Sequence, residues 1–371
     1  MKKKGIRIAM IAVLCVAMIG AMAACGSDSS SSTAGSGSTA AAGSTGGGEE
    51  PADDVTLKFT YWVGAGGLPE VKVVDPFVAA VEELTGGEVK IDKYPGGTLA
   101  ASDATLEAVT SGLADIGFVY TGWETGSFPI SSMLEYPTYF ASNNAASYTY
   151  RDVVNLLKPA EFDGIHVLIA YGSGEGVFLS NVREITKPDD FKGQEVRVGS
   201  DVMNRTVTAF GGTPVSMPAS ESYEALRSGV CNAWQGTPEA VNNLKLTEVV
   251  DFATPIHFAN TTYIVFMNND VYNKLSAKNQ AALDEAGNRT FEGGASNFME
   301  DAATLTYENL EKEGAKVTFL TEAQEQAFID VVGTYLDDFA KELDAKGLPG
   351  TESLATIREY QDKYNAQFPG K

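Results

Sequence analysis

Apolar residues recur along the first part of the chain with two periods, one typical of strands and one typical of helices. Residues 55–62 alternate as in a half-buried strand, and the apolar residues between 74 and 84 are spaced as on one face of a helix. Two glycines end this helix, and residues 89–94 form the next predicted strand. A helix around residues 106–113 and a strand over residues 115–120 follow. This alternation of strand and helix predicts an open α/β unit.

Residues 191–238 repeat the same order of elements. The strand 195–198 leads into a helix of about ten residues that stops at a glycine pair, because glycine accepts the left-handed backbone of a helix end. A second helix stops at Gly229, and a short strand with Trp234 follows. Small ligands of open α/β sheets bind at the ends of such strands, so we expect recognition chemistry in this segment.

Two extended passages are predicted to connect the units. One is the glycine-rich passage 172–176 after the buried strand 165–171, and the other is the strand 263–267. Further along, residues 321–343 carry an apolar stripe that predicts one long helix packed on a lobe.

These crossings divide the folded part of the chain into two lobes. We expect residues 54–173 with 264–305 to form the first lobe, and residues 174–263 with 306–371 to form the second. The length agrees, because about 320 residues exceed the usual size of a single core.

The N-terminus has the pattern of an exported lipoprotein. Basic residues precede the apolar run 8–22, which is short for a membrane span and ends in small residues before Cys25. We expect residues 1–24 to be a signal peptide and Cys25 to carry a lipid; the alternative is an ordinary secretory signal with a chance cysteine. Residues 25–53 are rich in Ser and Gly and predict a flexible tether. The expected location is extracytoplasmic, at the cell surface or in the periplasm, with membrane contact only through this lipid.

The net charge limits the classes of possible partner, and the cysteine content limits the possible disulfides. The formal net charge is −22, which disfavours nucleic acid and anionic lipid surfaces as partners. An acidic ligand then needs a local cationic site that outweighs this field. Cys231 is the one cysteine of the folded part, so no disulfide is expected there.

Enzyme motifs are largely missing. The two histidines, His166 and His257, lie far apart in sequence, and no zinc-binding spacing, phosphate-binding loop or nucleophile elbow is present. The glycine run 172–176 lacks the helix and acid of a dinucleotide site. His166 lies in an apolar strand and is predicted to be a core residue. We therefore expect no cofactor, no metal and no catalytic group.

Arg197 is the most informative charge, because it lies in a strand that should be buried on one face. A desolvated guanidinium needs an anion, and its planar fork matches a carboxylate. An internal Asp or Glu could equally be that anion. Trp62 and Trp234 each lie at the carboxyl end of a predicted strand, one in each lobe, and Tyr120 ends a third. They are candidate ligand platforms, although a tryptophan is more often a core residue.

Several motifs occur in a fixed order. Upstream are YPGGTL (94–99), SGLADIGF (111–118) and FPISSMLEYP (128–137). Within residues 183–238 the pattern residues are Arg183, Asp190, Lys192, Gly193, Arg197, Val198, Gly212, Pro214, Glu221, Tyr223, Ala225, Leu226 and Gly229. In these motifs the chain resembles the solute-binding proteins of tripartite ATP-independent periplasmic (TRAP) transporters, the DctP-type family. The resemblance covers about residues 55–345.

The resemblance implies a two-lobed α/β fold of the periplasmic-binding-protein type (class II), with extended crossings, an interlobe cleft and a long bracing helix. Such proteins close over one organic acid and deliver it to a membrane permease. The carboxylate-clamping arginine of the family falls on Arg197 and a ligand-contact position on Trp62, while the strand after the second helix brings residues up to Gly236 to the cleft. Arg183 matches another arginine of the pattern.

Departures from the pattern affect the expected ligand. Ala219 replaces an aromatic residue, Asn232-Ala233 replaces Asp-Gly, and Val177 stands where some relatives have a second arginine. A single cation with two indoles and a widened wall suits a monocarboxylate with an apolar or aromatic body. C4-dicarboxylates, sugar acids and keto acids stay open.

The sequence therefore predicts a TRAP receptor that is not an enzyme. Its expected partners are an organic acid and the permease subunits. The alternatives are the receptor of an ABC importer and, with less support, an extracytoplasmic hydrolase or transferase. The expected ligand-binding residues are Arg197, Trp62, Tyr120, Trp234, Gly236, Ala219 and Arg183.

Overall fold

The computed structural model describes residues 54–370, which contain two β-sheets. The five-stranded sheet has the order β2-β1-β3-β10-β4, and the six-stranded sheet has the order β11-β9-β5-β8-β6-β7. The strands of the first sheet are β1 (Val55–Tyr61), β2 (Val89–Tyr94), β3 (Ile116–Tyr120), β4 (Ile165–Gly172) and β10 (Thr262–Asn268). Those of the second are β5 (Gly176–Ser180), β6 (Glu195–Val198), β7 (Thr213–Ser216), β8 (Ala233–Gly236), β9 (Phe252–Ile256) and β11 (Lys316–Val317).

Both sheets are mixed in the same way. In the first, β1 is parallel to β2 and β3, and β10 runs antiparallel to β3 and β4. In the second, β6 is parallel to β7 and β8, and β5 runs antiparallel to β8 and β9. In each sheet an incoming strand therefore inserts into a parallel α/β unit. The two-lobed α/β class predicted from the sequence is confirmed.

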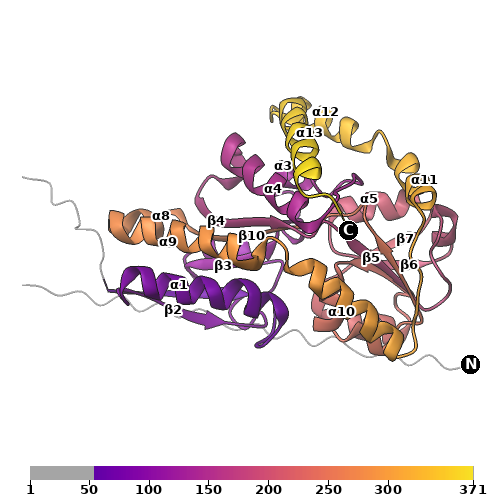
Figure 1. Ribbon diagram of the computed structural model, residues 1–371, viewed down its shortest axis with the longest axis horizontal. Helices are drawn as coiled ribbons and strands as arrows, with labels where there is room; N and C mark the ends of the chain where they lie inside the picture. Colours follow the sequence, from indigo (N-terminus) through magenta and orange to yellow (C-terminus); the bar gives the residue numbers. More distant parts are fainter. Residues whose placement is uncertain (1–53, 371) are drawn as a thin grey trace, which may run out of the picture. The chain divides into compact units, whose positions relative to one another are not determined.

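Helices cover both sheets (Figure 1). Beside the first sheet are α1 (Asp75–Thr85), α2 (Thr105–Thr110), α3 (Pro129–Met133), α4 (Asn143–Leu157), α8 (Asn269–Lys274) and α9 (Ala277–Thr290). Beside the second are α5 (Asp201–Ala209), α6 (Ser222–Ser228), α7 (Pro238–Asn243) and α10 (Phe298–Lys312). The chain closes with α11 (Glu322–Val332), α12 (Tyr335–Ala345) and α13 (Gly350–Gln367).

Extended strips connect the two sheets. Residues 173–175 lead from β4 to β5, and residues 257–261 lead back from β9 to β10. The strips lie side by side, because the Ser173 amide donates to the Thr261 carbonyl at 3.0 Å and the Thr261 amide donates to Ser173 Oγ at 3.0 Å. The second crossing thus precedes the strand that the sequence favoured, since β10 pairs along its whole length in the first sheet.

The expectation of one long helix over residues 321–343 is wrong. The helix is interrupted at Gly333 and Thr334, between α11 and α12. Phe328 of α11 packs on second-lobe rings, namely Phe178, Phe191, Phe210 and Phe258. In contrast, α12 and α13 lie beside α3 and α4 (Figure 1), and their apolar side chains join the core there. Because the two parts pack on different lobes, the chain must turn between them, and glycine is a poor helix former.

This packing also corrects the expected lobe boundaries. The sequence predicts residues 306–371 in the second lobe, but α12 and α13 pack on the first. Thr262 and Tyr263 likewise belong to the first sheet, because β10 begins at Thr262.

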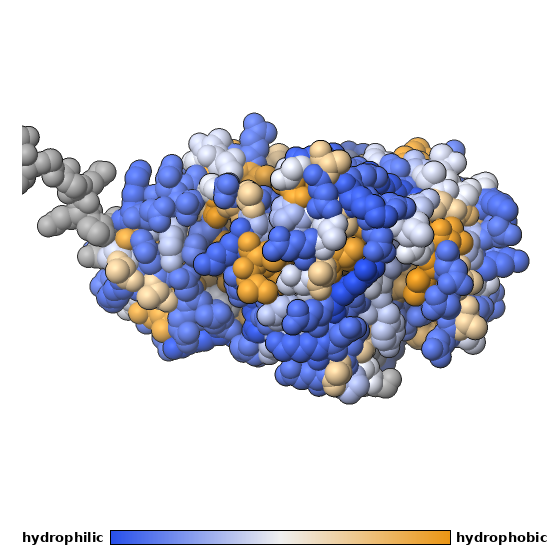
Figure 2. All heavy atoms as spheres, turned by 90° about the horizontal axis from the view of Figure 1, so that it is seen from above, coloured by the Kyte–Doolittle hydropathy of each residue, from blue (hydrophilic) through white to orange (hydrophobic). Residues whose placement is uncertain are grey.

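The surface seen in Figure 2 is mainly hydrophilic, with small apolar patches that do not merge. Among the described residues, none of the helices combines the length and apolar character needed to cross a bilayer. The expected signal peptide, the tether and Cys25 lie outside the described residues.

Candidate functional site

A small cavity lies between the two sheets and brings together most of the expected ligand residues. It is lined by Trp62, Tyr120, Arg197, Ala219, Trp234 and Gly236, together with Trp123, Gly199, Met203, Thr237, Ala240, Leu244, Thr261 and Tyr263. Its volume is about 30 Å³, which is roughly the space of one water molecule. In this closed arrangement an organic acid can enter only if the lobes or side chains move apart.

Arg197 reaches this cavity from β6, the strand next to the β7 edge of the second sheet. On β6 it pairs in register with Val215 of β7 and Trp234 of β8, so its backbone is fixed on both sides. The residue is 3% exposed, Nη2 donates to the Met217 carbonyl at 2.8 Å, and Nε has no partner. No Asp or Glu within residues 54–370 forms an ion pair with it.

Burial lowers the pKa of Arg197 to about 10, while nearby Tyr120 and Cys231 act in the opposite direction. The guanidinium therefore stays cationic at neutral pH. A buried cation without an anion is costly. The alternative that an internal acid neutralises Arg197 is not realised in the described part of the chain.

Aromatic rings from the first lobe form the opposite wall. Trp62 follows β1 and Tyr120 ends β3, and both meet Trp123 edge-on, with ring centroids 5.2 Å and 5.4 Å apart. Tyr263 of β10 lies 5.8 Å from Tyr120. The Trp62 Nε1 atom is buried without a partner. Sequence reasoning missed Trp123 and Tyr263, although Trp123 comes only three residues after a predicted strand end.

Trp234 lines the cavity, but its place in the strand differs from the expected one. It is the second residue of β8 and not at the carboxyl end, and it is 1% exposed. Its Nε1 donates to Ser222 Oγ at 3.2 Å, and its ring belongs to the apolar core below α6 and α7. It touches the cavity from within that core. Gly236 lets this ring lie flat beneath it, since a Cβ at position 236 would come within 2.2 Å of Trp234 Cη2.

Arg183 lies apart from the cavity. It follows β5 in a loop, is exposed, and is not among the cavity-lining residues. Its position therefore does not support a role at this site. Arg183 is exposed in its loop, whereas Arg197 lies buried within the sheet.

The described residues hold no grouping of three or more metal-binding side chains. His166 is half-buried, not a core residue as expected; its Nε2 lies 2.7 Å from Asp284 Oδ1, and its ring stacks on Tyr272. His257 pairs with Glu325 at 2.8 Å. Neither histidine lines the cavity.

Comparison with known proteins gives the same picture. The model of the family "bacterial extracellular solute-binding protein, family 7" matches residues 63–342. The 2,3-diketo-L-gulonate-binding periplasmic protein YiaO of Escherichia coli is 26% identical over 76% of this chain and 85% of its own length. The C4-dicarboxylate-binding periplasmic protein DctP of Rhodobacter capsulatus is 24% identical over 83% of this chain and 91% of its own.

Solved structures share the fold. A TRAP solute-binding protein from a marine metagenome, specific for aromatic acid ligands, superposes with a TM-score of 0.79 at 22% identity, over 84% of this chain and 99% of its own. A TRAP solute-binding protein from Rhodoferax ferrireducens, in complex with copurified benzoate, gives 0.79 at 20% identity, over 84% and 99%. These matches do not favour the receptor of an ABC importer. The chain belongs to family 7 of the bacterial extracellular solute-binding proteins, the extracytoplasmic TRAP receptors that bind carboxylate ligands and are not enzymes.

Proposed function

We propose that this receptor binds the carboxylate of its ligand through Arg197 in the cavity between the lobes. The observation that carries the proposal is that the Arg197 guanidinium is 3% exposed, has no carboxylate partner among the described residues, and has a free Nε donor. A carboxylate from outside would supply the missing anion and accept this hydrogen bond. Trp62, Tyr120 and Trp123 would cover the body of the ligand from the first lobe.

The ligand class that fits this cavity is a monocarboxylate with an aromatic or apolar body. Arg197 is the one cationic side chain among the lining residues, so one carboxylate is matched and a second would be left without a partner. Most of the remaining lining is aromatic or aliphatic. Related structures support this class: the metagenome protein is in complex with metahydroxyphenylacetate, and one from Bordetella bronchiseptica has bound mandelate.

The charge of Arg197 couples closure of the lobes to binding of the ligand. With the cleft open, water can solvate Arg197; with the cleft closed and empty, the cation is desolvated and unpaired. The ligand carboxylate removes that cost, and exclusion of water then strengthens the ion pair. The closed, liganded receptor is the form that the membrane permease would recognise.

Membrane attachment belongs to the same proposal. Residues 1–24 are a signal peptide, Cys25 is acylated, and residues 25–53 tether the binding unit. In cell fractionation, the protein should sediment with membranes and Cys25→Ser should release it. A wild-type protein found only in the soluble fraction contradicts the anchor.

A thermal-shift screen of organic acids tests the ligand assignment. A ligand that binds only the folded state increases the free energy of unfolding, by about 2.7 kcal/mol at a ligand concentration 100 times Kd. The melting temperature rises as a result. Benzoate, hydroxyphenylacetate and mandelate should stabilise the protein without being turned over, and Arg197→Ala should abolish the shift. Stabilisation by dicarboxylates alone, or an unchanged shift in Arg197→Ala, contradicts the proposal.

A further inference from the structure

A buried carboxylate without a cationic partner lies directly behind the ligand cavity. Glu135, in the segment after α3, is 5% exposed, and no Lys, Arg or His within residues 54–370 forms an ion pair with it. Tyr120 donates its hydroxyl proton to Glu135 Oε2 at 2.6 Å, and Thr262 donates to Oε1 at 3.2 Å. Tyr120 also lines the ligand cavity with Arg197. One phenol therefore connects Glu135 to the proposed carboxylate site.

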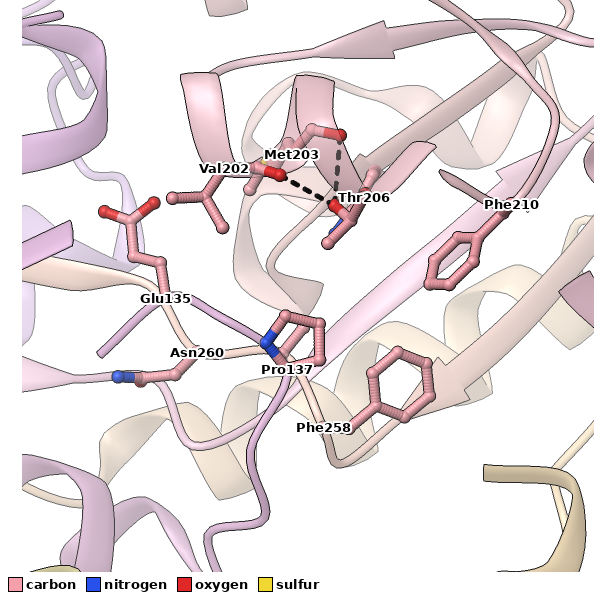
Figure 3. A pocket seen from close by; sticks show the side chains of 10 residues that line it. Glu135, Pro137, Val202, Met203, Thr206, Phe210, Phe258 and Asn260 are labelled. Atoms are coloured by element: carbon pink, nitrogen blue, oxygen red, sulfur yellow. Dashed lines mark hydrogen bonds between the residues drawn. The ribbon is translucent and has the colours of Figure 1, made fainter. Parts of the chain in front are cut away.

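Residues of the second lobe help to bury Glu135. It lines a cavity of about 10 Å³ together with Val202 and Met203 of α5, which belong to the second lobe. Figure 3 shows its carboxylate beside Val202, at the start of that helix. Ser200, the N-cap of α5, is within hydrogen-bonding reach of Glu135. The backbones also approach closely here, since a Cβ at Gly122 would lie 2.8 Å from Ser200 Cβ.

The groups around Glu135 leave it short of positive charge. The titratable or charged residues of the surrounding elements are Tyr120 of β3, Tyr136, Tyr150 of α4, Asp201 and Arg205 of α5, and Arg197 of β6. Asp201 is exposed, and Arg205 is paired with Glu342 at 3.2 Å on the surface. Burial raises the pKa of Glu135 to about 7, against the smaller opposing effect of its hydrogen bonds. The group can therefore change its protonation near neutral pH.

When Glu135 is ionised, its hydrogen bond with Tyr120 prevents Tyr120 from donating to a ligand. A carboxylate accepts only, so Tyr120 must give its one proton to Glu135 and can present only a lone pair to the cavity. A ligand carboxylate meeting that lone pair is repelled. A protonated Glu135 can donate to Tyr120 instead, which leaves the phenol proton for the ligand.

We propose that the receptor takes up one proton with its acid: Glu135 is protonated from solvent as the lobes close, and Tyr120 turns its hydroxyl from Glu135 to the ligand carboxylate beside Arg197. This inference rests on the proposed function, because it requires a carboxylate at Arg197. No covalent bond other than the new O–H of Glu135 forms.

The expected pH dependence follows from the direction of the shift. In the closed state the pKa of Glu135 is about 7, above the ordinary value of 4.5 that water contact in the open state would restore. The protonated form thus favours closure, so affinity is highest below pH 5 and is lost as pH rises through 7. Between pH 5 and pH 7 the affinity should fall by up to about 40-fold. Arg197 stays cationic throughout this range, because its pKa is about 10.

Titration calorimetry of the wild-type protein with benzoate or mandelate, in buffers of different ionisation enthalpy, measures the protons taken up per bound acid. We expect about 0.5 to 1 proton between pH 6 and pH 7. Glu135→Gln should bind the acid with no proton uptake and with a flat pH profile. Tyr120→Phe should weaken binding more at pH 6 than at pH 8.

Glu161 provides the matched control. Burial raises its pKa to about 7 as well, but it binds the Ile130 and Ser131 amides of α3 and does not line either cavity. Glu161→Gln should retain the proton uptake of the wild type. Binding without proton uptake in the wild type overturns this inference and leaves the proposed function intact, whereas undiminished binding by Arg197→Ala overturns the proposed function itself. Equal uptake in Glu135→Gln and the wild type also overturns the inference.

Discussion

The two walls of the cleft differ in chemistry. The first lobe contributes mainly rings, namely Trp62, Tyr120, Trp123 and Tyr263. The second contributes one cation, Arg197, together with small residues, the apolar side chains of Met203 and Leu244, and Trp234 of its own core. Rings bury area without strict orientation, while a guanidinium fork fixes one carboxylate. Neither wall alone holds an acid at both its charged end and its body. A ligand that uses both walls therefore ties its affinity to closure of the lobes.

Removal of the cation of the second wall should have the largest effect on the affinity for the acid. Arg197→Ala takes away the partner of a buried carboxylate, which typically costs about 3–5 kcal/mol. Affinity for the acid should therefore fall by at least about 100-fold in titration calorimetry. Arg197→Lys keeps the charge and loses the planar fork, so it should bind with an intermediate affinity. Equal affinity in Arg197→Ala and wild type would place the carboxylate elsewhere.

A methyl group added between the two walls, at Gly122, should have the next largest effect on affinity. The Cβ of Gly122→Ala would lie 2.5 Å from the Tyr120 ring and 2.8 Å from Ser200 Cβ of the other lobe. Such overpacking typically destabilises the packed state by about 1–3 kcal/mol. Opening of the lobes relieves the clash with Ser200, so the closed, ligand-binding form is disfavoured. We expect about 5- to 150-fold weaker binding and a more open form in small-angle scattering with ligand.

Gly293→Ala is the control for this added methyl group. Gly293 is exposed, and a Cβ there would meet nothing within 4 Å. It should bind as the wild type does. Weaker binding in both glycine variants would show that the effect does not arise between the walls.

The two tryptophans should separate binding from stability. Trp62 lines the first wall with an unpartnered Nε1, so Trp62→Ala should weaken binding by about tenfold, or ~1.4 kcal/mol. Trp234 belongs to the second-lobe core and donates to Ser222, so Trp234→Phe should mainly lower the melting temperature. Calorimetry and thermal unfolding of both variants test this. A reversed outcome would make Trp234 the ligand platform that the sequence suggested.

The sequence predicts what depends on local pattern. Alternation and glycine stops give the strand and helix order of both lobes, and an arginine between two valines in a half-buried strand singles out Arg197. It does not predict which lobe α12 and α13 cover, because this depends on contacts with α3 and α4 that lie some two hundred residues away. Glu135 lies in the motif 128–137, but the sequence does not show its burial, because this depends on Ser200 and α5 from the other lobe.

Arg183 offers the smallest expected effect and the sharpest contrast with Arg197. Both arginines match positions of the family pattern, but one is exposed in a loop and the other is buried at the cavity. An exposed charge in water interacts weakly with a ligand that it does not touch, and salt screens what remains. Arg183→Ala should therefore bind the acid within about twofold of the wild-type affinity, with an unchanged melting temperature. A loss of affinity comparable to that of Arg197→Ala would mean that the loop after β5 reaches the ligand when the cleft closes, and that the second wall holds two cations instead of one.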